Sequence, residues 1–396
     1  MRILHLSKFY PPDPGGLEHI VASLAEGAAQ AGHDVRVVCA RGSRWKGSAA
    51  KEQPLAIRNG VTIHRLATPM VVWSQPIALG YLGAARWKAD VVYVHRPHPL
   101  ADLAVFLTRP TGLIVFHHSD VQRQRAFRTL YRPLAHAVAR RAYASVVGAK
   151  TNLQNADDLG PAGIARARVI PFGVDEMRFT VKSVDDRPKA FGPADQAVGL
   201  FVGRLVSYKG LDVLLRAVAG TALRVVIVGE GPLRAQLEAE ILSLGIGDQV
   251  RLAARVSERD LPWFYQTADY LLLPSTTPAE MFGVTMLEAM ACGKPLISSS
   301  VASGMREVNL HDVTGLQVPP GDHEALRQAM LRLVADESLR QRMGAAGRRR
   351  VEERFTVRGM IAAHLDLCEE VAKANTGGRS LVQPDGPPSA TDTDSR

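Results

Sequence analysis

The sequence predicts an α/β protein of two domains, each built on a parallel sheet with helices on its faces. Its 396 residues exceed what a single ordinary core accommodates. Short apolar runs alternate with helical patterns, the order typical of parallel sheets, and this order restarts near residue 196 after a polar stretch. A hydrophobic content of 46% and a charged content of 22% are typical of a globular enzyme.

The first domain, placed at residues 1–179, opens with a strand–helix–strand unit. The apolar run RILHLSKFY predicts the first strand and DVRVVCA the second. Between them Gly15 and Gly16 open a helix, whose N–H groups can face an anion or a sugar, although a simple turn also explains two glycines. A nicotinamide-binding unit is excluded, because the intervening loop SKFYPPDPGG lacks G-x-G-x-x-G and the second strand has no acidic end.

The rest of this domain contains the segments GVTIHRL, ADVVYVHRPH and LADLAVFLTR, followed by the strand LIVF. His117 and His118 stand at the carboxyl end of that strand, where ligands collect in open α/β sheets. No third metal ligand has a suitable spacing, so we expect no metal and interpret the pair first as buried structural histidines.

The second domain, placed at residues 196–357, follows a polar, proline-bearing stretch at 180–195 that we predict to be a linker. It begins with AVGLFVGRLVSYKGLDVLLRAVAG, a strand, a loop and a helix. The loop carries Arg204 and Lys209 among glycines. Two cations at the carboxyl end of a strand can clamp a pyrophosphate, although in isolation they also fit ordinary surface charges.

The segment PAEMFGVTMLEAMACGKP carries Glu280 and Glu288, separated by seven residues. A helix is predicted from Val284 to Cys292, and its start at Phe282 and Gly283 suits a phosphate, because the first N–H groups of a helix are unpaired. Glu288 lies inside the helix and can accept two hydrogen bonds from a ribose diol, while Glu280 can hold hydroxyls on the other side of the phosphate. Both acids could instead be solvated, but the helix around Glu288 is largely apolar.

These residues resemble the E-x7-E signature of the family 4 retaining glycosyltransferases, which have the GT-B fold of two Rossmann-like βαβ domains facing each other across a cleft. The resemblance extends over nearly the whole chain except its tail, because GRL…KG, HSD and the segment IPFGVD also match family segments. It implies that Arg204 and Lys209 bind the donor diphosphate and that His118 lines the cleft near the transferred sugar. It also implies that Arg255 and Val256 lie where family members hold the donor base.

The family resemblance further implies retention of anomeric configuration, with no cofactor besides the nucleotide diphosphate sugar that serves as substrate. No residue pair suggests a double-displacement nucleophile, and no Asp-x-Asp triplet occurs before the tail, so we expect metal-independent transfer. A final helix at 358–374 is expected to cross back onto the first domain, and the Gly/Pro/Ser-rich tail at 375–396 to be disordered.

The charge is uneven along the chain. Residues 1–180 hold 23 Lys and Arg against 12 Asp and Glu, a balance of +11, whereas the remainder holds 25 against 27. Such a first half favours an anionic partner. The segment from Val121 to Arg141 is a basic amphipathic helix that fits either a solvated surface or anionic lipid. Nucleic acid is not expected, because no aromatic stacking platform accompanies the charge.

The composition also bears on the cellular compartment. No apolar run reaches the length of a membrane span, and the start MRILHLSKF does not have the pattern of a signal peptide. Three widely separated cysteines fit buried thiols in a reducing compartment; they are Cys39, Cys292 and Cys368. We therefore expect a cytoplasmic protein that associates peripherally with the inner face of the cell membrane through the basic helix.

We expect a hexosyltransferase that acts on a glycan or lipid-linked acceptor in cell-surface polysaccharide synthesis. The segments FHHSDVQRQ and VNLHDVTGL resemble bacterial enzymes of lipopolysaccharide-type synthesis, among which mannosyltransferases are frequent. Two alternatives stay open: a nucleotide-sugar epimerase of the same fold, and a non-catalytic module that senses nucleotide sugars. The sensing module would need neither Glu280 nor His118.

Overall fold

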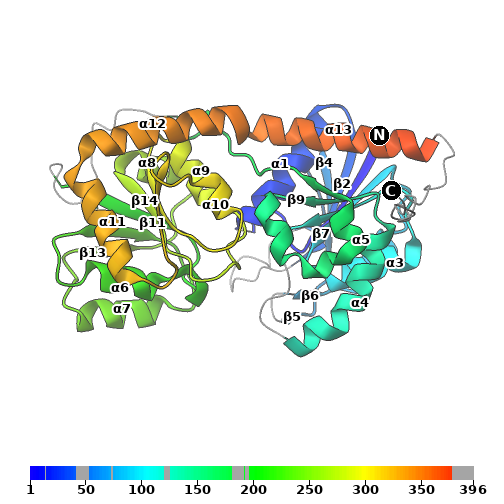
Figure 1. Ribbon diagram of the computed structural model, residues 1–396. Helices are drawn as coiled ribbons and strands as arrows, with labels where there is room; N and C mark the ends of the chain where they lie inside the picture. The colour runs from blue at the N-terminus through cyan, green and yellow to red at the C-terminus, as the bar shows by residue number, and fades with distance from the viewer. Residues whose placement is uncertain are drawn as a thin grey trace, which may run out of the picture.

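The protein is described here by a computed structural model that covers residues 1–13, 15–41, 53–72, 75–119, 125–180, 191 and 196–376, with the side chains of 125–127 and 376 left out. Two α/β units lie side by side, and two long helices run over both of them (Figure 1). The predicted α/β class with two Rossmann-like domains is confirmed. The expected linker, apart from residues 180 and 191, and the tail beyond residue 376 lie outside the described residues.

The first sheet has the strand order β10-β9-β8-β7-β1-β2-β4-β3. All its pairings are parallel except β3 with β4. Its strands are β1 (Arg2–Leu6), β2 (Asp34–Ala40), β3 (Leu55–Arg58), β4 (Val61–Leu66), β7 (Val91–Arg96), β8 (Leu113–His117), β9 (Ala144–Val147) and β10 (Ala167–Val169). Its helices are α1 (Gly16–Gln30), α2 (Gly80–Ala84), α3 (Pro99–Thr108), α4 (Arg125–Arg141), η2 (Lys150–Asn155), η3 (Asp157–Leu159) and α5 (Gly160–Ala165). A separate hairpin pairs β5 (Met70–Val72) with β6 (Gln75–Ile77).

The second sheet is entirely parallel within the described residues and has the order β13-β12-β11-β14-β15-β16. Its strands are β11 (Val198–Val202), β12 (Arg224–Val228), β13 (Val250–Ala253), β14 (Tyr270–Leu273), β15 (Leu296–Ser299) and β16 (Gly315–Val318). Its helices are η5 (Ser207–Lys209), α6 (Leu211–Val218), α7 (Arg234–Ser243), α8 (Leu261–Thr267), α9 (Val284–Ala291), α10 (Met305–Val308) and α11 (His323–Ala335).

The central strands are buried and mostly apolar because helices cover both faces of each sheet. Every residue of β7, β11 and β14 is buried. Parallel strands that are buried on both faces have continuous hydrophobic runs instead of an alternating pattern. This explains why short apolar runs predicted the strands of both domains.

Each sheet has a point where the chain reverses its direction of winding. In the first sheet β1 lies between β2 and β7, and in the second sheet β11 lies between β12 and β14. Loops that leave the carboxyl ends of two such strands diverge to opposite faces and open a crevice between them. The loops after β1, β11 and β14 contain Gly15, Lys209 and Glu280 respectively, so the fold positions them at these crevices.

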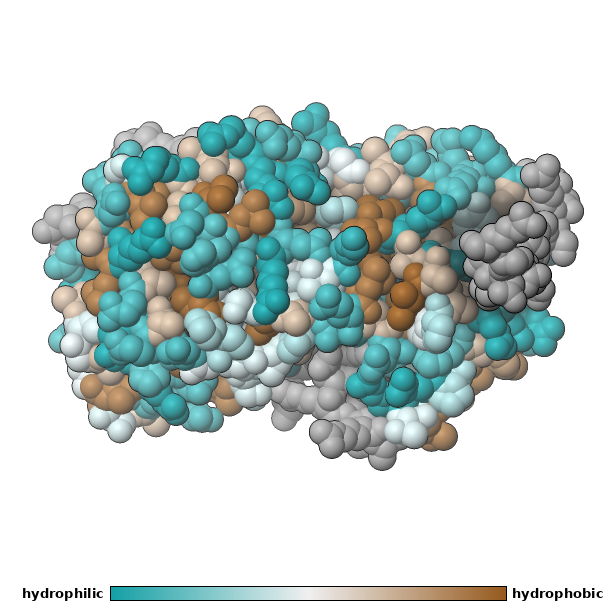
Figure 2. Space-filling view, viewed as in Figure 1, coloured by the Kyte–Doolittle hydropathy of each residue, from teal (hydrophilic) through white to brown (hydrophobic). Residues whose placement is uncertain are grey.

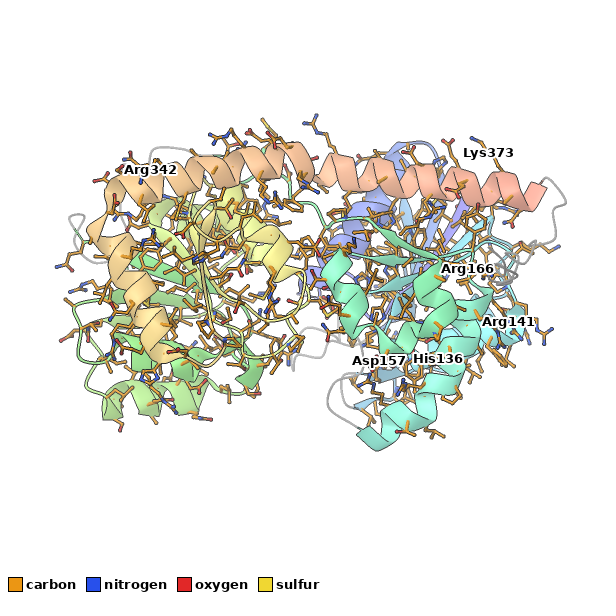
Figure 3. All side chains as sticks on the ribbon, viewed as in Figure 1. His136, Arg141, Asp157, Arg166, Arg342 and Lys373 are labelled. Carbon is orange, nitrogen blue, oxygen red and sulfur yellow. The ribbon has the colours of Figure 1, made fainter. Side chains whose placement is uncertain are left out.

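Two C-terminal helices connect the domains. The helix α12 (Glu337–Arg354) packs on α9 in the second domain, and α13 (Val357–Thr376) packs on α1 in the first. Arg342 and Lys373 mark the two far ends of this pair in Figure 3. The helical path is interrupted between α12 and α13, where Thr356 forms a parallel bridge with Val174 of the first domain.

Direct hydrogen bonds also connect the two domains. The backbone N–H of Thr151 at η2 donates to Glu307 Oε1 on α10 at 2.5 Å. Nearby, the backbone N–H of Gly304 donates to Asn152 Oδ1 at 2.8 Å, within a buried contact. These bonds hold the second domain against the carboxyl side of the first sheet.

Candidate active site

Lys209 and Glu280 meet at the point where the second sheet reverses. Lys209 ends η5 after β11, and Glu280 lies in the loop after β14. The Lys209 ammonium forms an ion pair with Glu280 Oε2, and the side chains are only 9% and 13% exposed. Two residues 71 positions apart in sequence are therefore in direct contact at the carboxyl edge of the sheet.

The pair keeps Lys209 positively charged although it is buried. Burial lowers the pKa of Lys209, but the carboxylate of Glu280 and the nearby Tyr208 together raise it, so the net shift is upward. Arg204, which follows β11 directly, acts against this shift as a second nearby cation. Two cations and one carboxylate at the end of a parallel sheet can bind a diphosphate and a neighbouring hydroxyl.

The N-terminus of α9 opens into the same region. Gly283 adopts a φ of +73°, a conformation that favours glycine, and the helix begins at Val284. The preceding Phe282 packs against Phe172 of the first domain, with ring centroids 4.8 Å apart. A Cβ added at Gly16 would lie 3.8 Å from Cγ2 of Val284. The first turns of α1 and α9 therefore approach each other across the cleft.

Glu288 lies in the second turn of α9 and is not a solvated residue. The hydroxyl of Tyr265 on α8 donates to its Oε2 at 2.5 Å. Burial raises the pKa of Glu288 to about 7, against the opposing effects of Tyr265 and the nearby His19 and Arg178. An acid with this pKa changes charge in the neutral range, so near pH 7 Glu288 is divided between the protonated acid and the carboxylate that could accept hydrogen bonds from a diol.

A second group of charges spans the domains beside Glu288. His19 Nε2 on α1 lies 3.0 Å from Glu258 Oε1, and Arg178 donates to Glu258 Oε2 at 2.9 Å. These contacts lower the pKa of Glu258 to about 2, led by the His19 hydrogen bond, and raise that of His19. The sequence did not lead us to this group. The position of His19 one turn after Gly16 was the available signal.

His118 directly follows β8, at the carboxyl edge of the first sheet. Its Nε2 lies 3.1 Å from Nδ1 of His95, and its ring packs on Phe116 and Phe172. Burial holds the pKa of His118 well below 6.5, so the ring is neutral. Among the described residues there is no group of three or more His, Cys, Asp or Glu that could hold a metal. Asp120 lies outside the described residues.

The remaining predicted donor-binding residues occupy the expected elements. Gly15 is the N-cap of α1 and Gly16 its first residue. Arg255 and Val256 follow β13 at the outer edge of the second sheet, where Arg255 is exposed and Val256 packs partly against the core. The three predicted thiols are free and buried.

The basic helix is α4, and part of its charge is engaged within the protein. Arg128 pairs with Asp157 at 2.5 Å, and Arg141 lies over the ring of Phe106 at 4.5 Å. Figure 3 shows Asp157 beside His136 of α4, whose Nε2 lies 2.7 Å from the Asp157 carbonyl oxygen. The start of the predicted basic segment, residues 121–124 with Arg123, lies outside the described residues.

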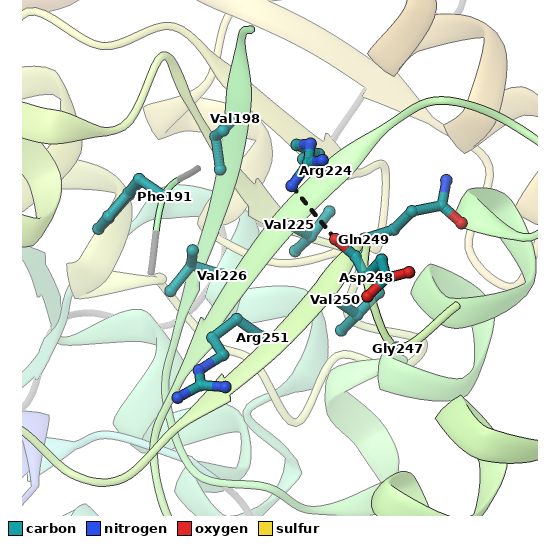
Figure 4. A pocket seen from close by; sticks show the side chains of 10 residues that line it. All are labelled: Phe191, Val198, Arg224, Val225, Val226, Gly247, Asp248, Gln249, Val250 and Arg251. Atoms are coloured by element: carbon teal, nitrogen blue, oxygen red, sulfur yellow. Dashed lines mark hydrogen bonds between the residues drawn. The ribbon is translucent and has the colours of Figure 1, made fainter. Parts of the chain in front are cut away.

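A cavity of about 310 Å³ lies at the opposite end of the second sheet. Arg224 begins β12 and Val250 begins β13, and both line the cavity together with Arg251 (Figure 4). It lies at the amino ends of these strands, so the loops that carry Lys209 and Glu280 do not line it.

Two parallel-sheet domains with facing carboxyl edges and a connecting C-terminal helix pair define the GT-B class of architecture. Residues 15–173 match the family described as "Glycosyl transferase 4-like domain", and residues 184–350 match "Glycosyl transferases group 1". The chain belongs to these family 4 glycosyltransferases.

Relatives match along nearly the full chain. D-rhamnosyltransferase WbpZ of Pseudomonas aeruginosa is 34% identical over 370 residues, covering 90% of this chain and 92% of the relative. O-antigen chain mannosyltransferase C of Escherichia coli is 32% identical over 376 residues, covering 93% and 98%. These matches support glycosyl transfer and do not favour an epimerase.

Solved structures share the fold. Sucrose-phosphate synthase of Thermosynechococcus elongatus superimposes with a TM-score of 0.80 at 23% identity, covering 94% of this chain and 99% of that one. Anabaena Alr3699/HepE in complex with UDP and glucose gives 0.75 at 19% identity, covering 93% and 99%. The predicted GT-B fold is confirmed.

Proposed function

We propose that this glycosyltransferase moves a hexose from a nucleotide diphosphate sugar to a glycan or lipid-linked acceptor, with retention of configuration, in cell-surface polysaccharide synthesis. The observation that carries the proposal is the buried Lys209–Glu280 pair beside the N-terminus of α9. A diphosphate with a sugar on one side and a ribose on the other fits this arrangement of cations, N–H groups and carboxylates.

Each group has a distinct role in this proposal. Arg204 and Lys209 bind the diphosphate, assisted by the N–H groups at Phe282, Gly283 and Val284. Glu280 holds hydroxyls of the transferred sugar, and Glu288 accepts hydrogen bonds from the ribose.

The first domain and the outer edge of the second complete this site. In our proposal, Gly15 and Gly16 bring the start of α1 to the donor, and Arg255 and Val256 lie beside the base. His118 contacts the transferred sugar. The acceptor enters between the domains from the side of the first.

The proposed chemistry proceeds on one face of the sugar. The bond from the anomeric carbon to the diphosphate oxygen breaks through an oxocarbenium-like state. The acceptor oxygen bonds to that carbon on the same side, and its proton passes to the departing phosphate. Arg204 and Lys209 stabilise the growing charge on the diphosphate, where electrostatic help contributes most. We therefore propose that transfer needs no metal ion.

Mannose is the candidate sugar. This choice rests on the O-antigen mannosyltransferase among the relatives, whereas WbpZ is named as a D-rhamnosyltransferase. A peripheral position at an anionic membrane surface is the second part of the proposal, because a lipid-linked acceptor would be presented there. The exposed part of α4 supports this position through Arg132 and Arg140.

The test is a panel of nucleotide sugars screened for thermal stabilisation, followed by transfer assays with the stabilising donors. NMR of the product should show the anomeric configuration of the donor, and transfer should continue in EDTA. A product with the inverted anomeric configuration would rule out the single-face mechanism. EDTA inhibition that a divalent ion reverses would remove the metal-free account. Conversion of the donor to an isomer without any acceptor would instead reveal an epimerase.

A further inference from the structure

Three imidazole rings form a hydrogen-bonded chain that ends at His118. His5 Nδ1 lies 2.9 Å from His95 Nε2, and His95 Nδ1 lies 3.1 Å from His118 Nε2. The rings of each neighbouring pair are nearly parallel, with an interplanar angle of 17° and centroids 5.3 and 5.4 Å apart. The three histidines therefore run from β1 across β7 to the end of β8, and they join the interior of the first domain to the cleft.

The register of the sheet produces this chain. His5 in β1 is paired with Tyr93 in β7, and His95 is paired with Phe116 in β8. Side chains two residues apart share one face of a strand, so His95 follows Tyr93 and His118 follows Phe116 on the same face. Each histidine is thus displaced by two residues from the one before it, along a diagonal of the sheet.

Hydrogen bonding in this chain couples the tautomers of the rings. A neutral imidazole has one donor nitrogen and one acceptor nitrogen. Burial lowers the pKa of His5 to about 3 and those of His95 and His118 well below 6.5, so all three rings are neutral. His95 uses both nitrogens within the chain. If it donates to His118 it accepts from His5, and if it accepts from His118 it donates to His5.

The chain leaves a single ring nitrogen of His118 for the cleft. Its Nε2 is engaged by His95, so only Nδ1 can meet a substrate. The side chains of His5 and His95 are 2% and 1% exposed, whereas His118 is 9% exposed, which identifies His118 as the end nearer the solvent. Phe172 packs between His118 and Phe282 and joins the ring to the loop that starts α9.

We propose that His95 is a positioning residue for His118: it holds that ring in one orientation and couples the tautomer of the ring to its own, so that Nδ1 of His118 faces the transferred sugar. This inference rests on the role of His118 in the proposed function. His95 itself touches no substrate, and its effect on the reaction passes through His118. The other explanation of the three rings is simple filling of the core.

Two substitutions of His95 separate positioning from core filling. The amide of asparagine occupies the place of Nδ1, so His95→Asn keeps a partner for His118 and loses the bond to His5. The amide of glutamine occupies the place of Nε2, so His95→Gln keeps the bond to His5 and loses the one to His118. Each variant loses one buried hydrogen bond, and their melting temperatures should fall by similar amounts.

The expected result is a difference in turnover between two variants of equal stability. His95→Gln should lower kcat by at least about tenfold, because a misplaced group near the reacting centre is costly. His95→Asn should stay within about threefold of the wild type, since His118 keeps its partner. Equal kcat values in the two variants, or a change that follows the melting temperature alone, would overturn the proposal.

Nitrogen NMR of the full-length protein tests the same point without catalysis. In the wild type the His118 ring should show one dominant tautomer, whereas His95→Gln, in which the ring loses its partner, should show exchange between two. A mixture of tautomers in the wild type would overturn the positioning role. His118→Ala with normal activity would instead remove the proposed function of His118, while a fixed tautomer in the wild type would still stand.

Discussion

At the scale of single residues, Lys209 and Glu280 are buried as an ion pair, and each charge lowers the energetic cost of burying the other. A buried charge without a partner costs several kcal/mol, but a close ion pair offsets much of this cost. A diphosphate would share Lys209 with Glu280, and Glu280 could then turn to a sugar hydroxyl. The charged groups that would bind the diphosphate are thus already held in place by this ion pair before a ligand binds.

Removing either cation should slow transfer strongly. We expect Arg204→Ala and Lys209→Ala each to lower kcat/KM by about a hundredfold, since losing one contact to a developing charge costs roughly 3 kcal/mol. Arg251→Ala is the matched control, because Arg251 lies at the amino end of β13 beside the distant cavity. Steady-state kinetics with a saturating acceptor measures the effect. Values within about threefold of the wild type for both site variants would exclude these cations from the site.

The buried position of Glu288 works against stability. Its pKa of about 7 exceeds the ordinary value of 4.5, so the folded protein holds this proton more tightly than the unfolded chain does. Stability from this group is therefore complete below pH 4.5 and decreases as the pH rises towards 7. This cost is consistent with a carboxylate kept for a ligand.

Glu288→Gln should stabilise the protein in alkaline solution while weakening donor binding. Glutamine carries no charge to bury, so the melting temperature at pH 8 should rise, with little change at pH 4.5. Donor affinity should fall because a ribose contact is made equally in the ground and transition states, which leaves kcat nearly unchanged. Glu238→Gln, on the exposed face of α7, is the control. Unchanged donor affinity in Glu288→Gln would show that Glu288 does not bind the ribose.

The candidate site residues were predicted from their type and spacing, and contacts that depend on strand register were missed. Glu280 and Glu288 lie within one loop and helix, so their relation is local. Tyr265 reaches Glu288 from another helix, and His95 reaches His118 from another strand. Such contacts follow only from the order and register of strands, which single-strand patterns do not contain.

At the scale of elements, a buried cluster around Arg96 fastens helices to the first sheet. Arg96 and Asp102 are fully buried, and Arg96 Nε donates to Asp102 Oδ1 at 3.0 Å. The same guanidinium donates to the carbonyl oxygens of Ala135 and Asp158, and the hydroxyl of Tyr131 donates to Asp102. One residue of β7 thus anchors α3, α4 and η3.

Removing Arg96 from the centre of this cluster should lower the free energy of unfolding far more than removing the Tyr131 hydroxyl at its edge. Arg96→Leu leaves the buried Asp102 with only the Tyr131 hydroxyl as a donor and removes the bonds to two carbonyl groups, which should lower the free energy of unfolding by about 3–5 kcal/mol. Tyr131→Phe removes one hydroxyl and should cost about 1–2 kcal/mol. Urea unfolding measures both changes. Equal losses in the two variants would show that Arg96 does not organise the cluster.

Helices and central strands were predicted well because their patterns are local and strong. The strand GVTIHRL corresponds to β4, and the helix expected from Val284 ends at Ala291, one residue before the predicted end. The antiparallel edge strand β3 and the hairpin of β5 and β6 were not predicted. Their residues are largely exposed, so they lack the apolar pattern that marks a buried strand.

At the scale of the whole molecule, the two domains differ in their sensitivity to acid. The buried histidines all belong to the first sheet, its loops or α13; they are His5, His95, His98, His117, His118 and His364. The second domain carries His311 and His323, which are exposed. Burial lowers the pKa values of His5, His98 and His364 to about 3.

Acid should therefore unfold the first domain before the second. The folded pKa of these histidines lies below the unfolded value of 6.5, so their stability is complete above pH 6.5 and is lost as the pH falls. At pH 5 each of the three costs about 2 kcal/mol. Hydrogen exchange followed by peptide analysis should show β1, β7 and β8 losing protection first. Earlier loss in β11 and β14 would contradict this order.

The surface of the molecule bears on its relation to membranes. No helix within the described residues is both long and apolar enough to cross a bilayer. On the face shown in Figure 2, hydrophobic residues stand in small groups among hydrophilic ones. On α4 the side chain of Leu130 is 80% exposed, and Arg132 and Arg140 are exposed on the same helix. Arg128 and Arg141 are instead engaged within the protein.

The first domain should bind anionic vesicles through this exposed part of α4. Each Lys or Arg near an anionic surface contributes about 1 kcal/mol, and the +11 balance of residues 1–180 adds a longer-range attraction. Binding should weaken with salt, because the Debye length falls from about 10 Å at 0.1 M to about 3 Å at 1 M.

Charge reversal with Arg132→Glu and Arg140→Glu together should abolish this binding in co-sedimentation, and Leu130→Ser should weaken it. Arg342→Glu is the control, because it reverses one exposed charge at the far end of α12 (Figure 3). All variants should keep the wild-type rate on a water-soluble acceptor, since they change the surface and not the cleft. Equal binding to neutral and anionic vesicles, or a loss of binding with Arg342→Glu equal to that of the α4 variant, would leave α4 an ordinary solvated helix.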